Sequence, residues 1–382
     1  MRKILTVLLM SVFIIGVIGC TPEDTEPKIE CGANEELVDG VCEYKTVSCA
    51  PGWVAYQGTC VEEQYVYEGT SVVLNGSQLI VEGVPFYMKG VCWNPVVKGG
   101  THPTGLDYIG TVEADALLMK EAGINVVRTY DAITDTDVLD VLYENGIYVI
   151  NTIYNYGGSS ATTAAANVNA VKDHPAILMW AIGNEWNYNG LYYDMTFEEA
   201  KDKINEVAEL IQSIDIYHPV STVYGHIPSG ETINDMPDID IWGLNMYSGL
   251  TFGNVFDTWK VRSYKPMFMA EYGADAWNAN TGRVDLEAQA EATRILTELI
   301  MANSSAADAN NVSIGGTIFE FNDEWWKDGN GSLDTHDSGG SAPGSGPHPD
   351  NTFNEEYWGI VDIDRNPRPA YFALQELFTE DE

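Results

Sequence analysis

The sequence predicts an α/β fold: a (β/α)8 TIM barrel preceded by a small disulfide-rich N-terminal segment. From about residue 72, short β-rich runs alternate with helical patterns, and eight such runs can be counted, as a barrel requires. Four cysteines within residues 31–62 predict the N-terminal segment. An open doubly wound sheet is the alternative, but no Gly-rich phosphate loop follows the first strand.

Residues 1–19 have the layout of a signal peptide, because Arg2 and Lys3 precede an apolar run. The small residue before Cys20 resembles a bacterial lipobox, so we expect cleavage there and lipid modification of Cys20. An ordinary signal peptide with a chance cysteine, or an uncleaved anchor, is the alternative. Residues 20–30 would form a linker. The protein is therefore expected to be an exported, membrane-anchored lipoprotein that faces the periplasm or the cell surface.

The cysteines of residues 31–62 form two Cys-x10-Cys loops, which is typical of a small disulfide module in an oxidising compartment. Of the three possible pairings, we favour Cys31 with Cys42 and Cys49 with Cys60. A zinc site is the competing interpretation, but paired C-x2-C spacing and a nearby histidine are missing. Cys92 stands apart and is expected to be a buried free thiol.

Composition excludes several functions. The chain of 382 residues carries 57 acidic and 19 basic side chains, a formal charge of −38, while 45% of its residues are hydrophobic. Such a chain can bury a core, so wholesale disorder is excluded, and its acidity excludes nucleic-acid binding. Neither HExxH, a P-loop nor a Ser-His-Asp order is present. We expect a monomer without cofactor or metal, whose partner is a poly- or oligosaccharide substrate.

Residues 63–382 are expected to form the barrel domain with a lead-in hairpin, whose turn is Asn75-Gly76. Thr196 and Glu199 predict a helix N-terminus by their capping-box spacing, and Gly123 and Gly146 stand where helix C-caps belong. The Gly/Ser-rich residues 328–350 predict a long loop after the eighth strand. The predicted strands are Phe86–Cys92, Asn125–Tyr130, Ile147–Ile153, Ile177–Ile182, Val220–Tyr224, Ile239–Met246, Pro266–Glu271 and Ile314–Phe321, and the last helix is Pro367–Phe378.

Two glutamates follow apolar strands at the ends where barrels carry their chemistry. Glu185 ends the fourth predicted strand and Glu271 the seventh. A carboxylate pair across a barrel mouth suits glycoside hydrolysis, with one acid protonating the leaving oxygen and the other attacking the anomeric carbon. Each glutamate alone could be a solvated strand-end residue; together they predict a catalytic pair.

On these motifs the sequence resembles the retaining glycoside hydrolases of clan A over most of residues 80–378. Gly183-Asn184-Glu185 resembles the acid/base motif, and Glu271 in AEYGAD is similar to the nucleophile segment of family 2 enzymes such as β-glucuronidases and β-galactosidases. GINVVRTYDA and FEFNDEWWKDG resemble β-1,3-glucanases and glucanosyltransferases of families 17 and 72. The resemblance implies that Arg128 hydrogen-bonds the nucleophile, Asn184 contacts the sugar 2-hydroxyl, Tyr247 positions the nucleophile, and Trp325 and Trp326 form an aromatic floor.

A physical argument also favours an interaction of Arg128 with a carboxylate, because a cation that ends an apolar strand needs a charge partner. A structural ion pair is its alternative role. Further strand-end side chains are candidates for sugar contacts: Asn94, His226, His102, Asp131 and Asn155. Exposed aromatic rings could stack on sugars, and the candidates are Trp93, Trp186, Tyr188, Trp277, Trp325, Trp326 and Trp358.

We therefore expect a retaining β-glycosidase that cleaves a β-linked polysaccharide, for which β-1,3-glucan is our prediction. Double displacement predicts carboxyl groups about 5 to 5.5 Å apart. A transglycosylase of the same clan and a β-mannanase or β-galactanase are alternatives. A non-catalytic surface glycan-binding lipoprotein is the alternative from another class, although binding alone needs no carboxylate pair.

Overall fold

The computed structural model describes residues 35–38, 41–48, 53–56, 59–62, 69–328, 347–348 and 352–379. The chain divides into two compact units, residues 1–67 and 68–382. The first unit contains two antiparallel hairpins, formed by β1 (Glu35–Val38) with β2 (Val41–Tyr44) and by β3 (Trp53–Tyr56) with β4 (Thr59–Glu62).

The N-terminal predictions are tested only in small part. Cys60 is disulfide-bonded. Its predicted partner Cys49, together with Cys20, Cys31 and the side chain of Cys42, lies outside the described residues. The signal peptide and most of the 328–350 loop lie outside them too, so cleavage, lipidation and cysteine pairing stay predictions. Among the described residues, no helix has the length and apolar character needed to cross a membrane.

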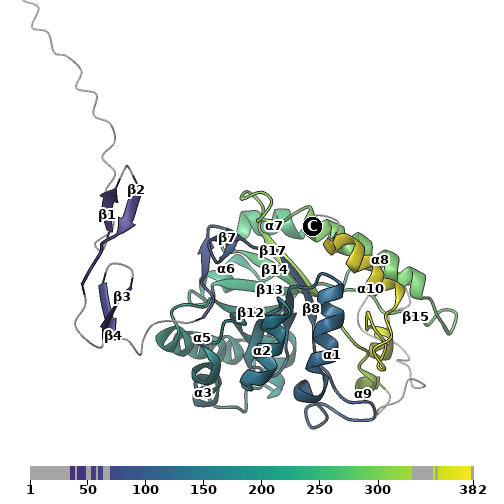
Figure 1. Ribbon diagram of the computed structural model, residues 1–382. Helices are drawn as coiled ribbons and strands as arrows, with labels where there is room; N and C mark the ends of the chain where they lie inside the picture. Colours follow the sequence, from purple (N-terminus) through teal and green to yellow (C-terminus); the bar gives the residue numbers. More distant parts are fainter. Residues whose placement is uncertain are drawn as a thin grey trace, which may run out of the picture. The chain divides into compact units, whose positions relative to one another are not determined.

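The second unit is a closed barrel of eight parallel strands surrounded by helices, which confirms the predicted fold class (Figure 1). The strands pair in chain order and the last closes onto the first. Each overlaps the strand predicted from the sequence. They are β8 (Met88–Cys92), β9 (Val126–Arg128), β10 (Tyr148–Tyr154), β11 (Ile177–Asn184), β12 (Val220–Gly225), β13 (Ile241–Asn245), β14 (Met267–Tyr272) and β17 (Ser313–Ile318).

The strands could be read from sequence because parallel barrel strands are buried on both faces and so become continuous apolar runs. All eight residues of β11 are buried. At the closing seam, Gly315 pairs with Met88 and has φ +127°, and a Cβ atom there would lie 2.2 Å from the Met88 carbonyl oxygen. Only glycine allows this close approach of β17 to β8.

Helices follow the strands and cover the barrel. Thr196 forms the predicted capping box with Glu199 at the start of α5, and Gly123 and Gly146 have the positive φ of helix C-termini. The helices are α1 (Tyr108–Glu121), α2 (Thr136–Glu144), α3 (Ala161–Val171), α4 (Trp186–Asn189), α5 (Phe197–Ile214), α6 (Gly230–Asn234), α7 (Val255–Arg262), α8 (Leu286–Met301), α9 (Trp325–Asp328) and α10 (Pro369–Thr379), with 3-10 turns η2 (Gly190–Tyr192) and η3 (Glu355–Tyr357).

The predicted lead-in hairpin is present as β5 (Val72–Asn75) and β6 (Gln78–Val81), extended by β7 (Val84–Pro85). Its Leu79 belongs to the same buried apolar cluster as Met88, the first residue of β8, and Ile314, the second residue of β17. The hairpin therefore adds to the core at the N-terminal ends of the strands and leaves the opposite ends open. A further two-stranded ribbon joins β15 (Trp277–Asn278) to β16 (Arg283–Val284).

Candidate active site

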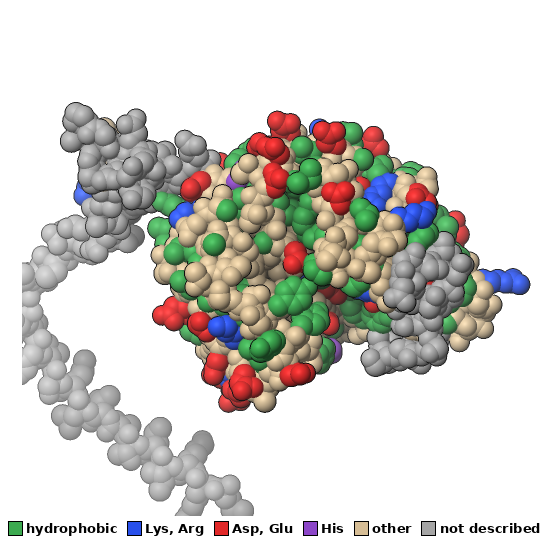
Figure 2. Space-filling view, turned by 90° about the horizontal axis from the view of Figure 1, so that it is seen from below, with side chains coloured by type: hydrophobic (Ala, Val, Ile, Leu, Met, Phe, Trp, Pro, Cys, Tyr) green, Lys and Arg blue, Asp and Glu red, His purple; other side chains and the backbone are tan. Residues whose placement is uncertain are grey.

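A cavity of about 1370 Å³ opens at the C-terminal ends of the barrel strands, and both predicted glutamates line it. Glu185 directly follows β11, the fourth strand, and Glu271 lies in β14, the seventh. Figure 2 views the molecule from the side on which α9 lies in Figure 1, and acidic side chains are spread over this face. The residues at the C-terminal ends of the strands border the cavity, and this is the end of a barrel at which active sites lie.

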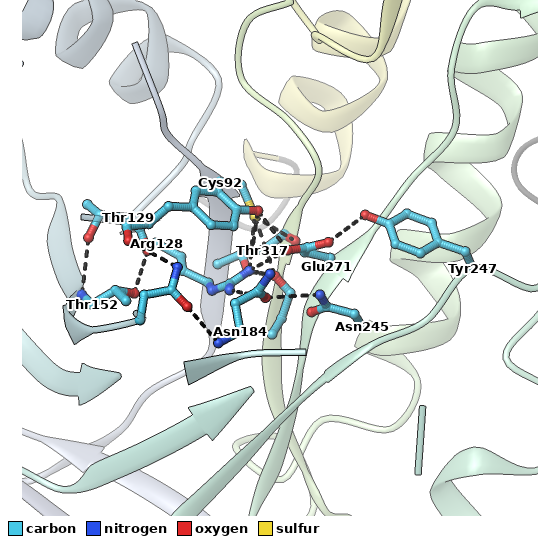
Figure 3. A network of polar contacts seen from close by, with 12 residues as sticks. Cys92, Arg128, Thr129, Thr152, Asn184, Asn245, Tyr247, Glu271 and Thr317 are labelled. Atoms are coloured by element: carbon cyan, nitrogen blue, oxygen red, sulfur yellow. Dashed lines mark hydrogen bonds and ion pairs between the residues drawn. The ribbon is translucent and has the colours of Figure 1, made fainter. Parts of the chain in front are cut away.

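Glu271 is held by three hydrogen-bond donors (Figure 3). Arg128 Nη1 donates to Glu271 Oε1 at 3.0 Å, and the Tyr247 hydroxyl donates to Oε2 at 2.8 Å. Both predicted partners thus contact the carboxylate. The third donor is the Tyr130 hydroxyl, which reaches Oε1 at 2.8 Å. These three donors hold both oxygens of the Glu271 carboxylate in place.

Sequence reasoning missed Tyr130, although a signal was present. Side chains two apart on a strand point to the same side, so a tyrosine two residues after a buried arginine belongs to the same site. The Arg128 guanidinium lies 4.6 Å from the Tyr130 ring centroid. Arg128 Nη1 also donates to the Tyr130 oxygen at 3.4 Å, which leaves the hydroxyl hydrogen for Glu271.

Glu185 has the opposite surroundings. Burial, and next the charge of Glu271, raise its pKa to about 7. The Asn245 side chain, Arg128 and Lys327 lower the pKa of Glu185, but by less than burial and Glu271 raise it. A carboxyl group with such a pKa can hold a proton near neutral pH, as a general acid requires. Its backbone is left-handed, with φ 48°, at the turn from β11 into α4.

Asn184 connects the surroundings of the two glutamates. Its Oδ1 accepts from Arg128 Nη2 at 2.7 Å and from Asn245 Nδ2 at 3.1 Å, and its backbone N–H donates to Asn155 Oδ1 at 2.9 Å (Figure 3). Asn184 lines the cavity, as expected of a sugar-contacting residue. The hydrogen bonds from Arg128 and Asn245 fix the position of its side chain.

A second polar cluster closes the cavity near the last strand. Asn94 Nδ2 donates to Glu324 Oε1 at 2.5 Å, and Glu324 Oε2 pairs with Lys327 Nζ at 2.6 Å. Lys327 Nζ also lies 3.7 Å from Glu355 Oε1. All four residues line the cavity, but the sequence analysis selected only Asn94. The other three depend on how α9 and η3 meet, which no local pattern specifies.

Most of the remaining predicted site residues line the cavity, but Trp325 does not. His226, His102 and Asn155 line the cavity, and His102 Nε2 lies 2.6 Å from Asp131 Oδ2. Trp326 also lines it, and its ring stacks on His102 at 5.3 Å. Trp325 is not among the lining residues; its ring lies under Lys98 Nζ at 4.8 Å, outside the cavity. At the end of the eighth strand, Phe319 lines the cavity instead.

Most of the other aromatic candidates are packing residues. Trp93, Trp186 and Trp358 are almost fully buried, and Trp277 stacks on Tyr357. Trp93 and Trp186 donate their indole N–H groups to Asp115 and Thr222, so they belong to the core rather than to a sugar-binding surface. Tyr188, in contrast, is exposed and lines the cavity.

The described residues contain no group of three or more His, Cys, Asp or Glu side chains that could hold a metal ion.

Comparison with known proteins finds similarity to glycoside hydrolases. Residues 159–321, which include both Glu185 and Glu271, match the TIM barrel domain of glycosyl hydrolases family 2. The chain is 24% identical over 240 residues to a β-glucuronidase of Paenibacillus borealis, and 24% identical over 233 residues to that of Homo sapiens. Each match covers 54% of this chain but only 38% and 33% of those enzymes.

Solved structures share the fold. A family 2 β-galacturonidase from Eisenbergiella tayi, bound to galacturonate, superposes with a TM-score of 0.57 at 20% identity, covering 81% of this chain and 54% of that one. A Bacteroides uniformis β-glucuronidase gives a TM-score of 0.59 at 19% identity, covering 82% and 37%. The resemblance to families 17 and 72 stays a prediction. The matches bear out the expectation of a glycoside hydrolase barrel, similar to that of family 2.

Proposed function

We propose that the protein is a retaining β-glycoside hydrolase that uses Glu271 as nucleophile and Glu185 as acid/base. The observation that carries this proposal is the contrast between two carboxyl groups in one cavity. Glu271 accepts three hydrogen bonds, whereas burial and the neighbouring charge raise the pKa of Glu185 to about 7. Two carboxyl groups with such different surroundings suit the two roles of double displacement.

In the first step, a Glu271 carboxylate oxygen forms a bond to the anomeric carbon while the glycosidic C–O bond breaks. The Glu185 proton moves to the leaving oxygen. In the second step, ionised Glu185 takes a proton from water, the resulting hydroxide attacks the anomeric carbon, and the ester bond to Glu271 breaks. Arg128, Tyr130 and Tyr247 orient the nucleophile throughout. The separation of about 5 to 5.5 Å between the carboxyl groups stays a prediction of this mechanism.

The substrate we propose is a neutral β-glucan, with β-1,3-glucan as the first candidate. The charge of the cavity supports a neutral sugar. Four carboxyl groups line it, those of Glu185, Glu271, Glu324 and Glu355, and Lys327 is the one Lys or Arg among the described lining residues. Since Lys327 already pairs with Glu324 and Glu355, a uronate carboxylate would find no unpaired Lys or Arg among the described lining residues.

The test is reducing-end release and product analysis on a panel of β-glucans, mannan, galactan and xylan, with the full chain. Glu185→Gln and Glu271→Gln should each abolish release, while Glu206→Gln, which changes an exposed ion-paired glutamate, should leave it intact. Products longer than the substrate would indicate transglycosylation. Activity retained in both cavity variants would contradict the assignment. A methylumbelliferyl β-glucoside and β-glucuronide pair tests the charge argument, and preference for the glucuronide would overturn it.

We also propose that Cys20 carries a lipid that tethers the enzyme to the cell envelope. The support is the signal-like sequence of residues 1–19 followed by cysteine. Radiolabelled palmitate fed to expressing cells should label the full chain, and Cys20→Ser should lose the label and enter the soluble fraction. An unlabelled, membrane-associated wild-type protein would contradict the lipid anchor.

A further inference from the structure

Three tyrosines line the cavity on the segments that follow the third and fourth barrel strands. Tyr156 comes from the loop after β10, and Tyr188 and Tyr192 come from α4 and η2 after β11. Tyr188 is 68% exposed and Tyr192 is 55% exposed. Large aromatic surfaces that stay exposed next to a cavity are typical of ligand contacts rather than of folding.

The ring of Tyr188 is fixed although it is exposed. It lies against Gly225 at the end of β12, where a Cβ atom would come within 2.2 Å of Tyr188 Cε2. The neighbouring Asn187 exchanges two hydrogen bonds with the Gly225 backbone, at 2.8 and 3.0 Å. The ring is therefore supported on one side by the backbone at Gly225, while 68% of Tyr188 stays exposed. A surface prepared in this way loses little freedom when a ligand binds.

Tyr192 is held in a comparable way. Its ring centroid lies 5.6 Å from that of Tyr156. Leu191 and Tyr192 both have left-handed backbones, with φ 56° and 53°, which side-chain-bearing residues seldom adopt. The fully buried Leu191 side chain and a 2.8 Å hydrogen bond from the Gly157 N–H to the Leu191 carbonyl hold this turn in place. The surrounding structure thus enforces the position from which Tyr192 faces the cavity.

The position of Tyr188 and Tyr192 relative to the cleaved bond is inferred from Glu185, the proposed acid/base. In double displacement the acid/base protonates the oxygen of the departing sugar, so that sugar lies next to the acid/base. Tyr188 and Tyr192 belong to the turns that come directly after Glu185. Burial, and then the Glu185 charge, raise the pKa of Tyr188, in keeping with a short distance between the two groups.

We propose that Tyr188, together with Tyr156 and Tyr192, forms a binding site for the sugar unit on the leaving side of the cleaved bond. This inference rests on the proposed function and adds to it. A site for a departing sugar favours substrates in which a further β-linked unit follows the cleaved bond. The same site would hold an incoming sugar acceptor when the covalent intermediate is resolved by transfer.

The experiment compares two substrates that differ only on the leaving side. β-Laminaribiosyl fluoride has no sugar there, whereas laminaripentaose has several. Tyr188→Ala should lower kcat/KM for laminaripentaose by about tenfold, the effect of losing about 1.4 kcal/mol of binding in the transition state. It should leave kcat/KM for the fluoride within about twofold. Tyr188→Phe keeps the ring and should resemble the wild type on both substrates.

Tyr193→Ala is the matched control, because Tyr193 is an exposed neighbour that does not line the cavity. It should change neither value. Equal losses on both substrates in Tyr188→Ala, or no loss on either, would overturn the leaving-side site. A wild type that turns over the fluoride but no oligosaccharide would overturn it too. A wild type inactive on the fluoride and on every polymer in the panel would instead overturn the proposed function itself, and the leaving-side site with it.

Discussion

The Tyr130 hydroxyl donates to Glu271 at 2.8 Å, on the same carboxylate oxygen that Arg128 contacts. Burial raises the pKa of Tyr130 well above its ordinary value, so the hydroxyl keeps its proton. Glu271 thus has one charged and one neutral donor on Oε1 and a second neutral donor, Tyr247, on Oε2. Both carboxylate oxygens are fixed in direction before any substrate arrives.

Removing either neutral donor should slow the enzyme without unfolding it. We expect Tyr130→Phe and Tyr247→Phe each to lower kcat by about 10- to 100-fold, because each deletes one hydrogen bond to a charged group, worth about 1.5 to 3 kcal/mol. Steady-state kinetics and circular dichroism check this. Tyr264→Phe, at an exposed tyrosine away from the cavity, serves as control. Wild-type kcat in Tyr130→Phe would show that its hydrogen bond is incidental.

Activity should fall as the pH rises through about 7, because in the proposed mechanism Glu185 must be protonated to assist departure of the sugar, and its pKa is raised to about 7. Lys327 lowers that pKa, so Lys327→Gln should move the alkaline limb of kcat/KM to higher pH. Lys98→Gln, which changes an ion-paired lysine outside the cavity, should not move it. A downward shift in Lys327→Gln would contradict the electrostatic assignment.

Glu185 should also reduce the stability of the fold at alkaline pH. Its pKa rises from 4.5 to about 7 on folding, so the folded state binds the proton more tightly than the unfolded state. Stability relative to a neutral residue is therefore lost as the pH increases from about 4.5 through 7. Glu185→Gln should be more stable than the wild type at pH 8, by about 1 to 3 kcal/mol, and nearly equal at pH 4. Urea unfolding at both pH values tests this, and a pH-independent difference would contradict it.

The buried pair of Arg368 and Asp323 should matter more than an exposed pair of similar geometry. Arg368 donates to both Asp323 oxygens, at 2.7 and 2.6 Å, yet burial still raises the pKa of Asp323 to about 7. Arg368→Met should cost about 3 to 5 kcal/mol at pH 8, because it leaves a buried charge without its partner. Arg294→Met, which breaks the exposed pair with Glu376, should cost less than about 1 kcal/mol. Equal losses in urea unfolding would contradict this.

The barrel could be predicted because its strands are apolar on both faces, and the two cavity glutamates because they lie at the ends of such strands. The site residues that could not be predicted from the sequence are those placed by contacts between distant segments. Trp325 and Trp326 are adjacent on α9 and point in different directions, and the sequence does not tell which one reaches the cavity. Lys327 and Glu324 were missed for the same reason. Trp93 and Trp186 follow strands yet lie in the core, since a strand-end position does not specify burial.

The seam between β8 and β17 has a consequence for how the chain acquires its fold. Its two strands lie near opposite ends of the barrel sequence, and Gly315 meets Met88 only when the last strand is in place. Until then β8 and β14 each have an edge of unpaired backbone groups, which can pair with other chains. During synthesis, the risk of aggregation should therefore persist until residues 313–318 have emerged and the ring has closed.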